Sequence, residues 1–406
     1  MKVRLARYWF AAPVVLAPLA AAAIFIWAVS PAQAQTKKGA TIGFVTELSG
    51  PASIFGEAGL QSAQLAVDEV NAAGGVLGGK LEMKVADDAT DPNIARQVWA
   101  KLISEGVDVI IFRETSAARV AALPEAEKAN IPALYPNDYE GGDCRPILYV
   151  FGEIEPQKVP PYLKFLKEKS GGNKFFLLAT DYNWARITVD MVKKEMPKLG
   201  GVIVGEEFTP FNTTDYTPLI TKIRDSGADV LFLGLVGGPD NVAFFKQARS
   251  AGLTQQIKVI GNIALEDGAL AAVGSAAEGT YMAASYFMTN DTPENRKFIA
   301  ALKAKYGSDM KVQGYLSEPS YDTVHLYALA VNKAGTTETS AVLKALSEVE
   351  FDGPKGRIHV TTDRHAAMPI YIARAKADGR YEVVKSLGVQ VPPKQCNPEP
   401  PFGMPK

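Results

Sequence analysis

The feature that most constrains this fold is a regular alternation between short β-rich segments and segments with helical spacing of apolar residues. Residues 41–46 form a short apolar run rich in β-formers, and after a turn the segment 57–70 carries apolar residues at helical spacing. This alternation predicts a parallel sheet covered by helices, with right-handed crossovers. It continues through expected strands 81–86, 107–112 and 133–135 and expected helices 94–104 and 117–129.

The alternation restarts after a looser stretch that contains Pro146, Pro156, Pro160 and Pro161. A chain of 406 residues is longer than one hydrophobic core usually organises. We therefore expect an α/β fold in which two doubly wound parallel-sheet lobes are joined by a multi-strand hinge. The second series has expected strands 174–179, 202–208, 229–234 and 257–261 and helices 185–196, 217–226 and 241–251, followed by helices 293–306, 320–334 and 340–346 and a strand at 368–374.

The pattern also predicts how the chain is divided. Each lobe is too small to hold a deep pocket alone, so we expect a ligand site in the crevice between them, at the carboxyl ends of the strands. The predicted parts are a signal peptide at 1–34, lobe one at 36–155 and 285–348, lobe two at 156–284 and 349–390, and a C-terminal tail at 391–406.

The N-terminus predicts export. Lys2, Arg4 and Arg7 precede an apolar stretch at 8–29, and the small-residue sequence Ala-Gln-Ala follows at 32–34. This is the order of a cleaved secretory signal. The alternative is an uncleaved membrane anchor, because the apolar stretch approaches the length that spans a bilayer. Either alternative places the remaining chain outside the inner membrane.

Composition argues against several classes of function. The formal net charge is −1 with no long Lys/Arg block, so nucleic acid is not an expected partner. The sequence has no nucleophile-elbow motif and only three scattered histidines, so we expect neither an enzyme nor a metal site, and no cofactor. Cys144 and Cys396 are compatible with either one disulfide or two buried thiols.

Two motifs have structural interpretations. The glycine-rich segment 74–80 matches the spacing of a phosphate-binding loop as far as its lysine, but it follows a helix and leads into a strand, so we interpret it as a turn. Asp87, Asp88 and Asp91 lie where a strand ends and a helix begins, and we expect them to form caps and turns.

Three loops at strand ends carry candidate binding residues. Thr115 and Ser116 lie at a helix start, where hydroxyls and free backbone N–H groups can hold a carboxylate or carbonyl oxygen; the alternative is that they only cap their own helix. Residues 135–142 and 180–184 bring aromatic side chains with polar tips to strand ends of opposite lobes. Together they predict a binding wall.

The chain resembles the type I periplasmic binding proteins of the Leu/Ile/Val-binding family over nearly all of its predicted mature length. Residues 42–51 look like that family's opening strand and loop, and 66–75 look like its first helix and exit turn. Within the family, it is most similar to the urea and short-amide binders, through the segments 135–141, 181–182, 241–247, 291–295 and 298–307.

The resemblance assigns roles to several residues. It implies that Ser116 is a ligand-binding hydroxyl, that Tyr135 and Tyr182 are aromatic pocket walls, that Asn137 contacts ligand, and that Leu235 and Val236 form a further pocket edge.

Four positions depart from the pattern. Glu114 stands where those amide binders carry an aromatic residue, and Trp184 where they tend to carry a tyrosine. Arg113 and Arg119 are expected to bring positive charge near the mouth of the site. A carboxylate at the wall would suit a ligand amine or amide N–H, whereas an arginine would suit an acid.

The resemblance implies an exported solute-binding receptor of an ABC importer, which closes its lobes around a small polar solute and delivers it to an inner-membrane permease with its ATPase. The solute classes left open are an amide or urea, a branched-chain amino acid and an aromatic acid. A ligand-sensing regulator with the same fold is the alternative function.

Overall fold

The computed structural model describes residues 6, 9–11, 38–236 and 238–395. Except for residues 6 and 9–11, the predicted signal peptide lies outside the described residues, as do Cys396 and the rest of the tail beyond it. In the described part of the chain, no helix has the length and apolar character needed to cross a membrane.

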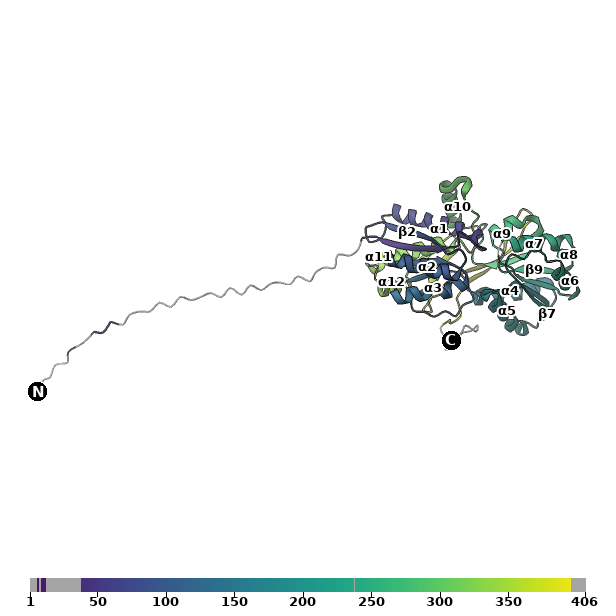
Figure 1. The fold of residues 1–406 in the computed structure, drawn as a ribbon, viewed down its shortest axis with the longest axis horizontal. Coiled ribbons are helices and arrows are strands. Elements are labelled where there is room, and N and C mark those ends of the chain that lie inside the picture. Colours follow the sequence, from purple (N-terminus) through teal and green to yellow (C-terminus); the bar gives the residue numbers. More distant parts are fainter. Residues whose placement is uncertain (1–5, 7–8, 12–37, 237, 396–406) are drawn as a thin grey trace. The chain divides into compact units, whose positions relative to one another are not determined.

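The first lobe is built on a parallel sheet with the order β2-β1-β3-β4-β5. Helices α1, α2 and α3 connect successive strands, and α11 returns late in the chain to pack against α1 (Figure 1). The bounds are β1 (Ala40–Thr46), α1 (Ser53–Ala72), β2 (Leu81–Asp87), α2 (Pro92–Ser104), β3 (Val109–Arg113), α3 (Ser116–Ala129), β4 (Ala133–Tyr135), β5 (Leu148–Val150), α10 (Pro293–Tyr306), α11 (Pro319–Ala334) and α12 (Thr339–Leu346).

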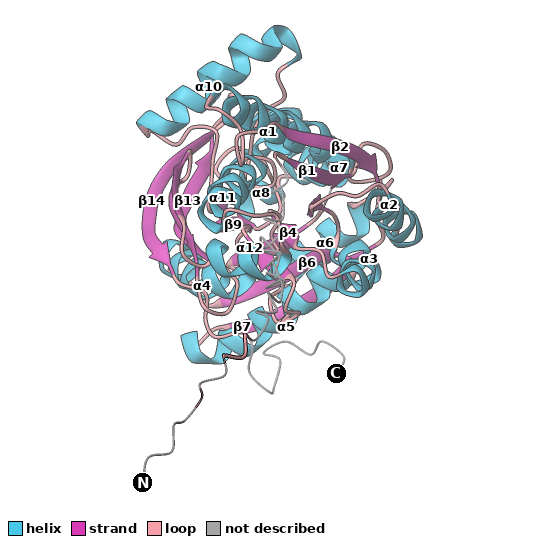
Figure 2. Cartoon of the chain, turned by 90° about the vertical axis from the view of Figure 1, so that its left-hand side faces the viewer, coloured by secondary structure: helices cyan, strands magenta, loops and turns pink. Residues whose placement is uncertain are grey.

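The second lobe is built on a mixed sheet with the order β11-β12-β13-β10-β9-β8-β6-β7. Strands β6 to β10 are parallel, while β13 runs antiparallel to β10 and pairs with β14, beside which it lies in Figure 2. The bounds are α4 (Glu155–Ser170), β6 (Lys174–Thr180), α5 (Asn183–Glu195), β7 (Val202–Thr209), α6 (Thr217–Asp225), β8 (Val230–Gly234), α7 (Gly238–Ser250), α8 (Leu253–Gln256), β9 (Val259–Asn262), α9 (Asp267–Val273), β10 (Tyr281–Ala284), β11 (Glu350–Gly353), β12 (Gly356–Val360), β13 (Ala366–Ala375) and β14 (Tyr381–Gln390).

The central strands are buried on both faces, as helices on both sides of a parallel sheet require. All residues of β3 and of β8 are buried. Local signals fix where the helices begin: the side chain of Asp91 accepts hydrogen bonds from the backbone N–H groups of Asn93 and Ile94 at the start of α2, as expected for a cap. The two-lobe α/β architecture predicted from the alternation is therefore confirmed.

The proline-bearing stretch differs from the prediction of a looser segment, because residues 155–170 form helix α4. Pro156 occupies the first turn, where a missing N–H costs no intrahelical bond, and the Gln157 side chain accepts a hydrogen bond from the backbone N–H of Ile154, at 2.9 Å. Burial of Val159, Tyr162 and Leu163 against the second sheet outweighs the cost of the prolines within the helix.

The glycine-rich segment 74–80 is a tight turn between α1 and β2, as predicted. Gly75 has a φ of +74°, and a Cβ there would lie 1.9 Å from the carbonyl oxygen of Gly79. Val76 and Gly79 form an antiparallel bridge across the turn. The backbone therefore pairs with itself and is not open to a phosphate.

The two lobes are connected at three places within the described chain: from β5 to α4, from β10 to α10, and from α12 to β11. The first two connections contact each other, since the backbone N–H of Ser285 donates to the carboxylate of Glu153. The side chain of Gln157 donates to the carbonyls of Ala366 and Gln390, at 3.1 and 2.8 Å. Several crossings tied together make a hinge in which the lobes can rotate but not separate.

The C-terminal segment returns to the first lobe. The side chain of Gln395 accepts a hydrogen bond from the backbone N–H of Gly142, and the backbone N–H of Gln395 donates to the carboxylate of Asp363. Cys144, two residues from Gly142, is disulfide-bonded. The second cysteine of the sequence, Cys396, lies outside the described residues.

Candidate functional site

A cavity lies between the lobes. Its lining comes largely from residues just beyond the carboxyl ends of parallel strands in both sheets, which is where open α/β sheets place ligands. The described lining consists of Glu47, Ala52, Phe55, Glu114, Thr115, Ser116, Tyr135, Asn137, Asp138, Tyr182, Trp184, Val236, Ala264, Tyr315 and Leu316.

The start of helix α3 forms one part of the lobe-one wall. Thr115 is the N-cap, and its hydroxyl accepts from the backbone N–H of Ala118 at 3.3 Å. Ser116 lines the cavity as well, but its hydroxyl donates to the carboxylate of Glu140 at 2.7 Å. The two adjacent hydroxyls thus have different partners, and only Thr115 caps the helix. The first N–H groups of a helix have no partner within it, so this corner can bind an oxygen atom.

Tyr135 is the last residue of β4, Asn137 follows that strand, and both share one hydrogen-bond partner. The hydroxyl of Tyr135 donates to the backbone carbonyl of Glu114 at 2.7 Å, and the Asn137 Nδ2 donates to the same carbonyl at 3.2 Å. The Asn137 Oδ1 atom is buried without a hydrogen-bond partner among the described groups. A buried acceptor of this kind is costly unless a ligand N–H satisfies it.

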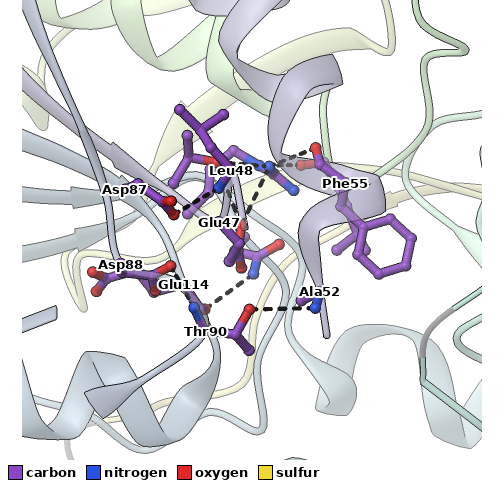
Figure 3. A network of polar contacts seen from close by, with 12 residues as sticks. Glu47, Leu48, Ala52, Phe55, Asp87, Asp88, Thr90 and Glu114 are labelled. Atoms are coloured by element: carbon purple, nitrogen blue, oxygen red, sulfur yellow. Dashed lines mark hydrogen bonds and ion pairs between the residues drawn. The ribbon is translucent and has the colours of Figure 1, made fainter. Parts of the chain in front are cut away.

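Three carboxyl groups gather beyond the ends of β1, β2 and β3. They belong to Glu47, Asp88 and Glu114, and Figure 3 shows them close together. Burial raises the pKa of Glu114 well above its usual range, and the nearby Asp88 raises it further. Burial, followed by the charge of Glu47, raises the pKa of Asp88 to about 8.

In this carboxyl cluster, Glu114 and Asp88 each accept a hydrogen bond at only one of their two oxygen atoms, among the described groups. The indole Nε1 of Trp99 donates to Oε1 of Glu114 at 3.0 Å, while Oε2 of Glu114 has no hydrogen-bond partner among the described groups. The backbone N–H of Thr90 donates to Oδ1 of Asp88 at 3.0 Å, and Oδ2 of Asp88 is likewise without one. Asp88 therefore forms a turn with Thr90 and Asp91, as predicted, and is also a buried acid near Glu114, whereas Asp91 is the helix cap.

Arg113 does not bring positive charge to the mouth of the site as expected. Its guanidinium is 1% exposed and donates to the carbonyl oxygens of Leu316 and Phe55, at 2.5 and 2.9 Å. It also lies 3.7 Å from the carboxylate of Glu47. Gly59 in α1 makes room for it, because a Cβ there would lie 2.5 Å from the arginine Cδ. The side chain instead fastens β3 to α1 and to the segment before α11.

Arg119 also departs from this expectation. It pairs with Glu140 at 2.8 Å and lies over the ring of Tyr139, 4.3 Å from its centroid. It is fully buried, because helix α3 turns it toward the β4 loop and away from the cavity. No lysine or arginine occurs in the described lining, whereas Glu47, Glu114 and Asp138 do.

The lobe-two wall is mainly aromatic and apolar. Tyr182 and Trp184 follow β6, with their ring centroids 6.0 Å apart, and the indole Nε1 of Trp184 donates to Glu155 at 2.9 Å. Val236 follows β8 and completes the edge. Leu235, predicted beside it, is not part of the lining: it is fully buried in the hydrophobic core, because successive side chains at a strand end point to opposite sides.

Sequence reasoning did not find the remaining lining residues. Glu47 and Asp138 each follow a predicted strand by one to three residues, so the strand-end rule that selected Glu114 and Asn137 also applies to them. Tyr315 and Leu316 precede α11, far from any parallel strand end, and only the folded chain brings them to the cavity.

Asp138 is part of a buried ion network at the hinge. The Lys158 Nζ lies 3.2 Å from Asp138, 2.7 Å from Glu153 and 3.2 Å from Glu155. Lys158 is fully buried, and the three carboxylates hold its pKa above its usual value despite burial. One lysine is therefore shared by three carboxylates, and acidic groups are in excess here as well as at the carboxyl cluster.

The family model described as "Periplasmic binding protein" matches residues 39–380, which include both lobes and every residue of the cavity lining. This chain belongs to the periplasmic binding protein family. The family fold accounts for the two α/β lobes. The resemblance to periplasmic binding proteins that the sequence indicated is therefore confirmed.

Three similar proteins extend this finding. The Leu/Ile/Val-binding protein homolog 6 of Brucella melitensis is 26% identical over 89% of this chain and 93% of its own. An ABC transporter substrate-binding protein from Sphaerobacter thermophilus is 25% identical, with a TM-score of 0.79 over 87% of this chain and 99% of its own. A solute-binding protein of an R. palustris ABC transporter, in complex with 4-hydroxybenzoate, is 22% identical with a TM-score of 0.80 over 87% of this chain and 98% of its own.

Proposed function

We propose that this protein is the extracytoplasmic solute-binding receptor of an ABC importer, and that it delivers a small polar organic solute to a membrane permease with its ATPase. The observation that carries the proposal is the cavity between the lobes, which is lined by carboxyl, hydroxyl, amide and aromatic side chains from both lobes. Family membership and the similar transporter component from Sphaerobacter thermophilus support the same role.

In the proposed mechanism, the solute first binds the lobe-one wall at Thr115, Ser116, Tyr135 and Asn137. Rotation about the hinge then brings Tyr182, Trp184 and Val236 over it. Closure removes water, which strengthens every polar contact to the solute. The closed form is the one that would dock on the permease.

The first test is a ligand screen on the predicted mature chain, residues 35–406, by thermal shift and then calorimetry. A solute that binds only the folded form raises the unfolding midpoint by mass action. The panel contains urea, short amides, all amino acids, aromatic acids and small organic cations. We expect one class to raise the midpoint, and absence of binding across all classes would contradict the proposal.

Cell fractionation separates import from sensing. A processed chain outside the cytoplasm supports the receptor, whereas an unprocessed cytoplasmic chain would favour a ligand-sensing regulator of the same fold. The predicted cleavage after Ala34 can be checked by N-terminal sequencing of the exported form.

A further inference from the structure

The cavity wall of lobe one has more carboxyl groups than cations to balance them. Glu47 is paired with Arg113 at 3.7 Å and Asp138 with Lys158 at 3.2 Å. Within the described residues, no ion pair is found for Asp88 or Glu114. Two adjacent buried carboxyl groups without an ion-pair partner are energetically costly, so either they bind protons or another cation joins them.

Two buried oxygen atoms of this wall lack a hydrogen-bond donor among the described groups. These atoms are Oε2 of Glu114 and Oδ1 of Asn137. Both residues line the cavity, and both are buried, with Asn137 9% exposed. Both side chains have their other polar atom fixed, Glu114 by the indole of Trp99 and Asn137 by the carbonyl of Glu114. The free oxygen atoms are therefore held in position to accept N–H groups from a ligand.

We propose that the carboxyl cluster of Glu47, Asp88 and Glu114 selects solutes that carry a positively charged nitrogen group with N–H donors, such as amidinium, guanidinium or ammonium, over neutral molecules of the same shape. Such a group supplies the missing charge and donates to the free oxygen atoms of Glu114 and Asn137. Charge-assisted hydrogen bonds of this kind are the stronger ones. This inference rests on the proposed receptor function and narrows its solute class.

The lobe-two wall suits the same ligand. The rings of Tyr182 and Trp184 lie opposite the acidic wall, and aromatic faces attract cations that have lost their water. A planar amidinium or guanidinium can use both walls at once, with its edge toward the carboxylates and its face toward the rings.

Binding of a cation by this cluster depends on pH. Protons and the ligand compete for the same carboxylates, so affinity for a cation should rise with pH. Burial and the charge of Glu47 raise the pKa of Asp88 to about 8, and the rise should continue up to that pH. The charged groups that act on Glu114 and Asp88 from the neighbouring elements are Glu47 of the β1 loop, Asp87 of β2, Arg113 of β3 and Arg119 of α3.

The test compares matched pairs of equal shape by calorimetry at pH 6.0, 7.0 and 8.5: guanidinium with urea, acetamidinium with acetamide, and benzamidinium with benzamide. We expect the cation of at least one pair to bind about tenfold or more tightly than its neutral partner, as a charged hydrogen bond implies. That preference should grow with pH, while the affinity of any neutral partner that binds stays constant.

Glu114→Gln tests the assignment to the cluster, because glutamine keeps the acceptor for Trp99 and removes the charge. We expect it to lower affinity for the cation about tenfold or more and to weaken the pH dependence, of which the part due to Asp88 remains. Glu82→Gln, which removes an exposed carboxylate from β2, is the matched control and should change neither. The comparison of cations with neutral partners uses only the wild-type protein. It therefore tests the proposal even if the Glu114→Gln variant fails to fold.

The outcomes separate this inference from the receptor function. Equal or tighter binding of the neutral partners, or a broad-panel ligand without a cationic nitrogen, would overturn the inference and leave the receptor function standing. Binding of nothing in the broad panel would overturn both.

Discussion

The two walls of the cavity do different chemical work. The lobe-one wall contains most of the polar groups, and internal hydrogen bonds fix them: Tyr135 and Asn137 donate to the carbonyl of Glu114, and Ser116 donates to Glu140. The lobe-two wall presents aromatic and apolar surface from Tyr182, Trp184 and Val236. In a receptor that closes by rotation, a preorganised polar wall can select the solute, while an aromatic wall can cover whatever shape is held there.

Leu235 and Val236 are adjacent at the end of β8, but they lie in different environments. Leu235 is fully buried in the core, and Val236 lines the cavity. We expect Leu235→Ala to lower the free energy of unfolding by about 2–5 kcal/mol, because it leaves a void in a packed core. Val236→Ala should affect solute affinity more than stability. Urea denaturation and calorimetry of both variants check this, and a reversal would mean that the edge is assigned to the wrong residue.

Trp184 is the largest side chain of the aromatic wall. We expect Trp184→Ala to weaken solute binding by about 2–4 kcal/mol, or roughly 30- to 1000-fold in Kd, because buried aromatic anchors dominate such interfaces. Trp184→Phe keeps a ring and should retain more of the affinity, although it leaves Glu155 without the indole donor. Calorimetry with the ligand found in the screen measures both. Unchanged affinity in the alanine variant would remove Trp184 from the site.

The buried carboxyl of Glu266, in lobe two, should make the stability of the protein depend on pH. Burial raises its pKa to about 8. Between the unfolded value near 4.5 and this folded value the folded state holds an extra proton, so wild-type stability falls as pH rises. We expect the unfolding midpoint of Glu266→Gln to exceed that of wild type by a margin that widens from pH 5 to pH 8, since one pKa unit corresponds to about 1.4 kcal/mol. A constant margin would contradict the assigned protonation.

Ser116 should have the smallest effect of the four. Its hydroxyl already donates to Glu140, so Ser116→Ala removes one hydrogen bond and one ligand contact. We expect a loss of about 1–1.5 kcal/mol in solute binding, or roughly tenfold in Kd. Thr115→Ser keeps the hydroxyl and the helix cap, so it should lose less affinity than Ser116→Ala. No loss in the alanine variant would mean that Ser116 serves only to orient Glu140.

Much of the fold followed from sequence because its signals are local. The alternation of strands and helices placed β1 to β4 and β6 to β9 within a few residues of their bounds. Strands β5, β10, β11, β12 and β14 were not predicted, because they are short or lie at sheet edges, where pairing partners come from distant parts of the chain. Helix α4 was hidden by its prolines, whose cost only tertiary burial offsets.

The candidate site divides in the same way. The sequence was sufficient to place polar and aromatic residues after the strand ends, and the carboxyl ends of parallel strands share one edge of a sheet. Eight of the nine predicted residues line the cavity. Only the tertiary structure decided what those residues face. It placed Arg113 and Arg119 in internal ion pairs and turned Leu235 into the core, and among the described residues it gave Glu114 and Asp88 no ion-pair partner. The direction and net charge of a buried side chain depend on neighbours from other elements, and no local pattern contains them.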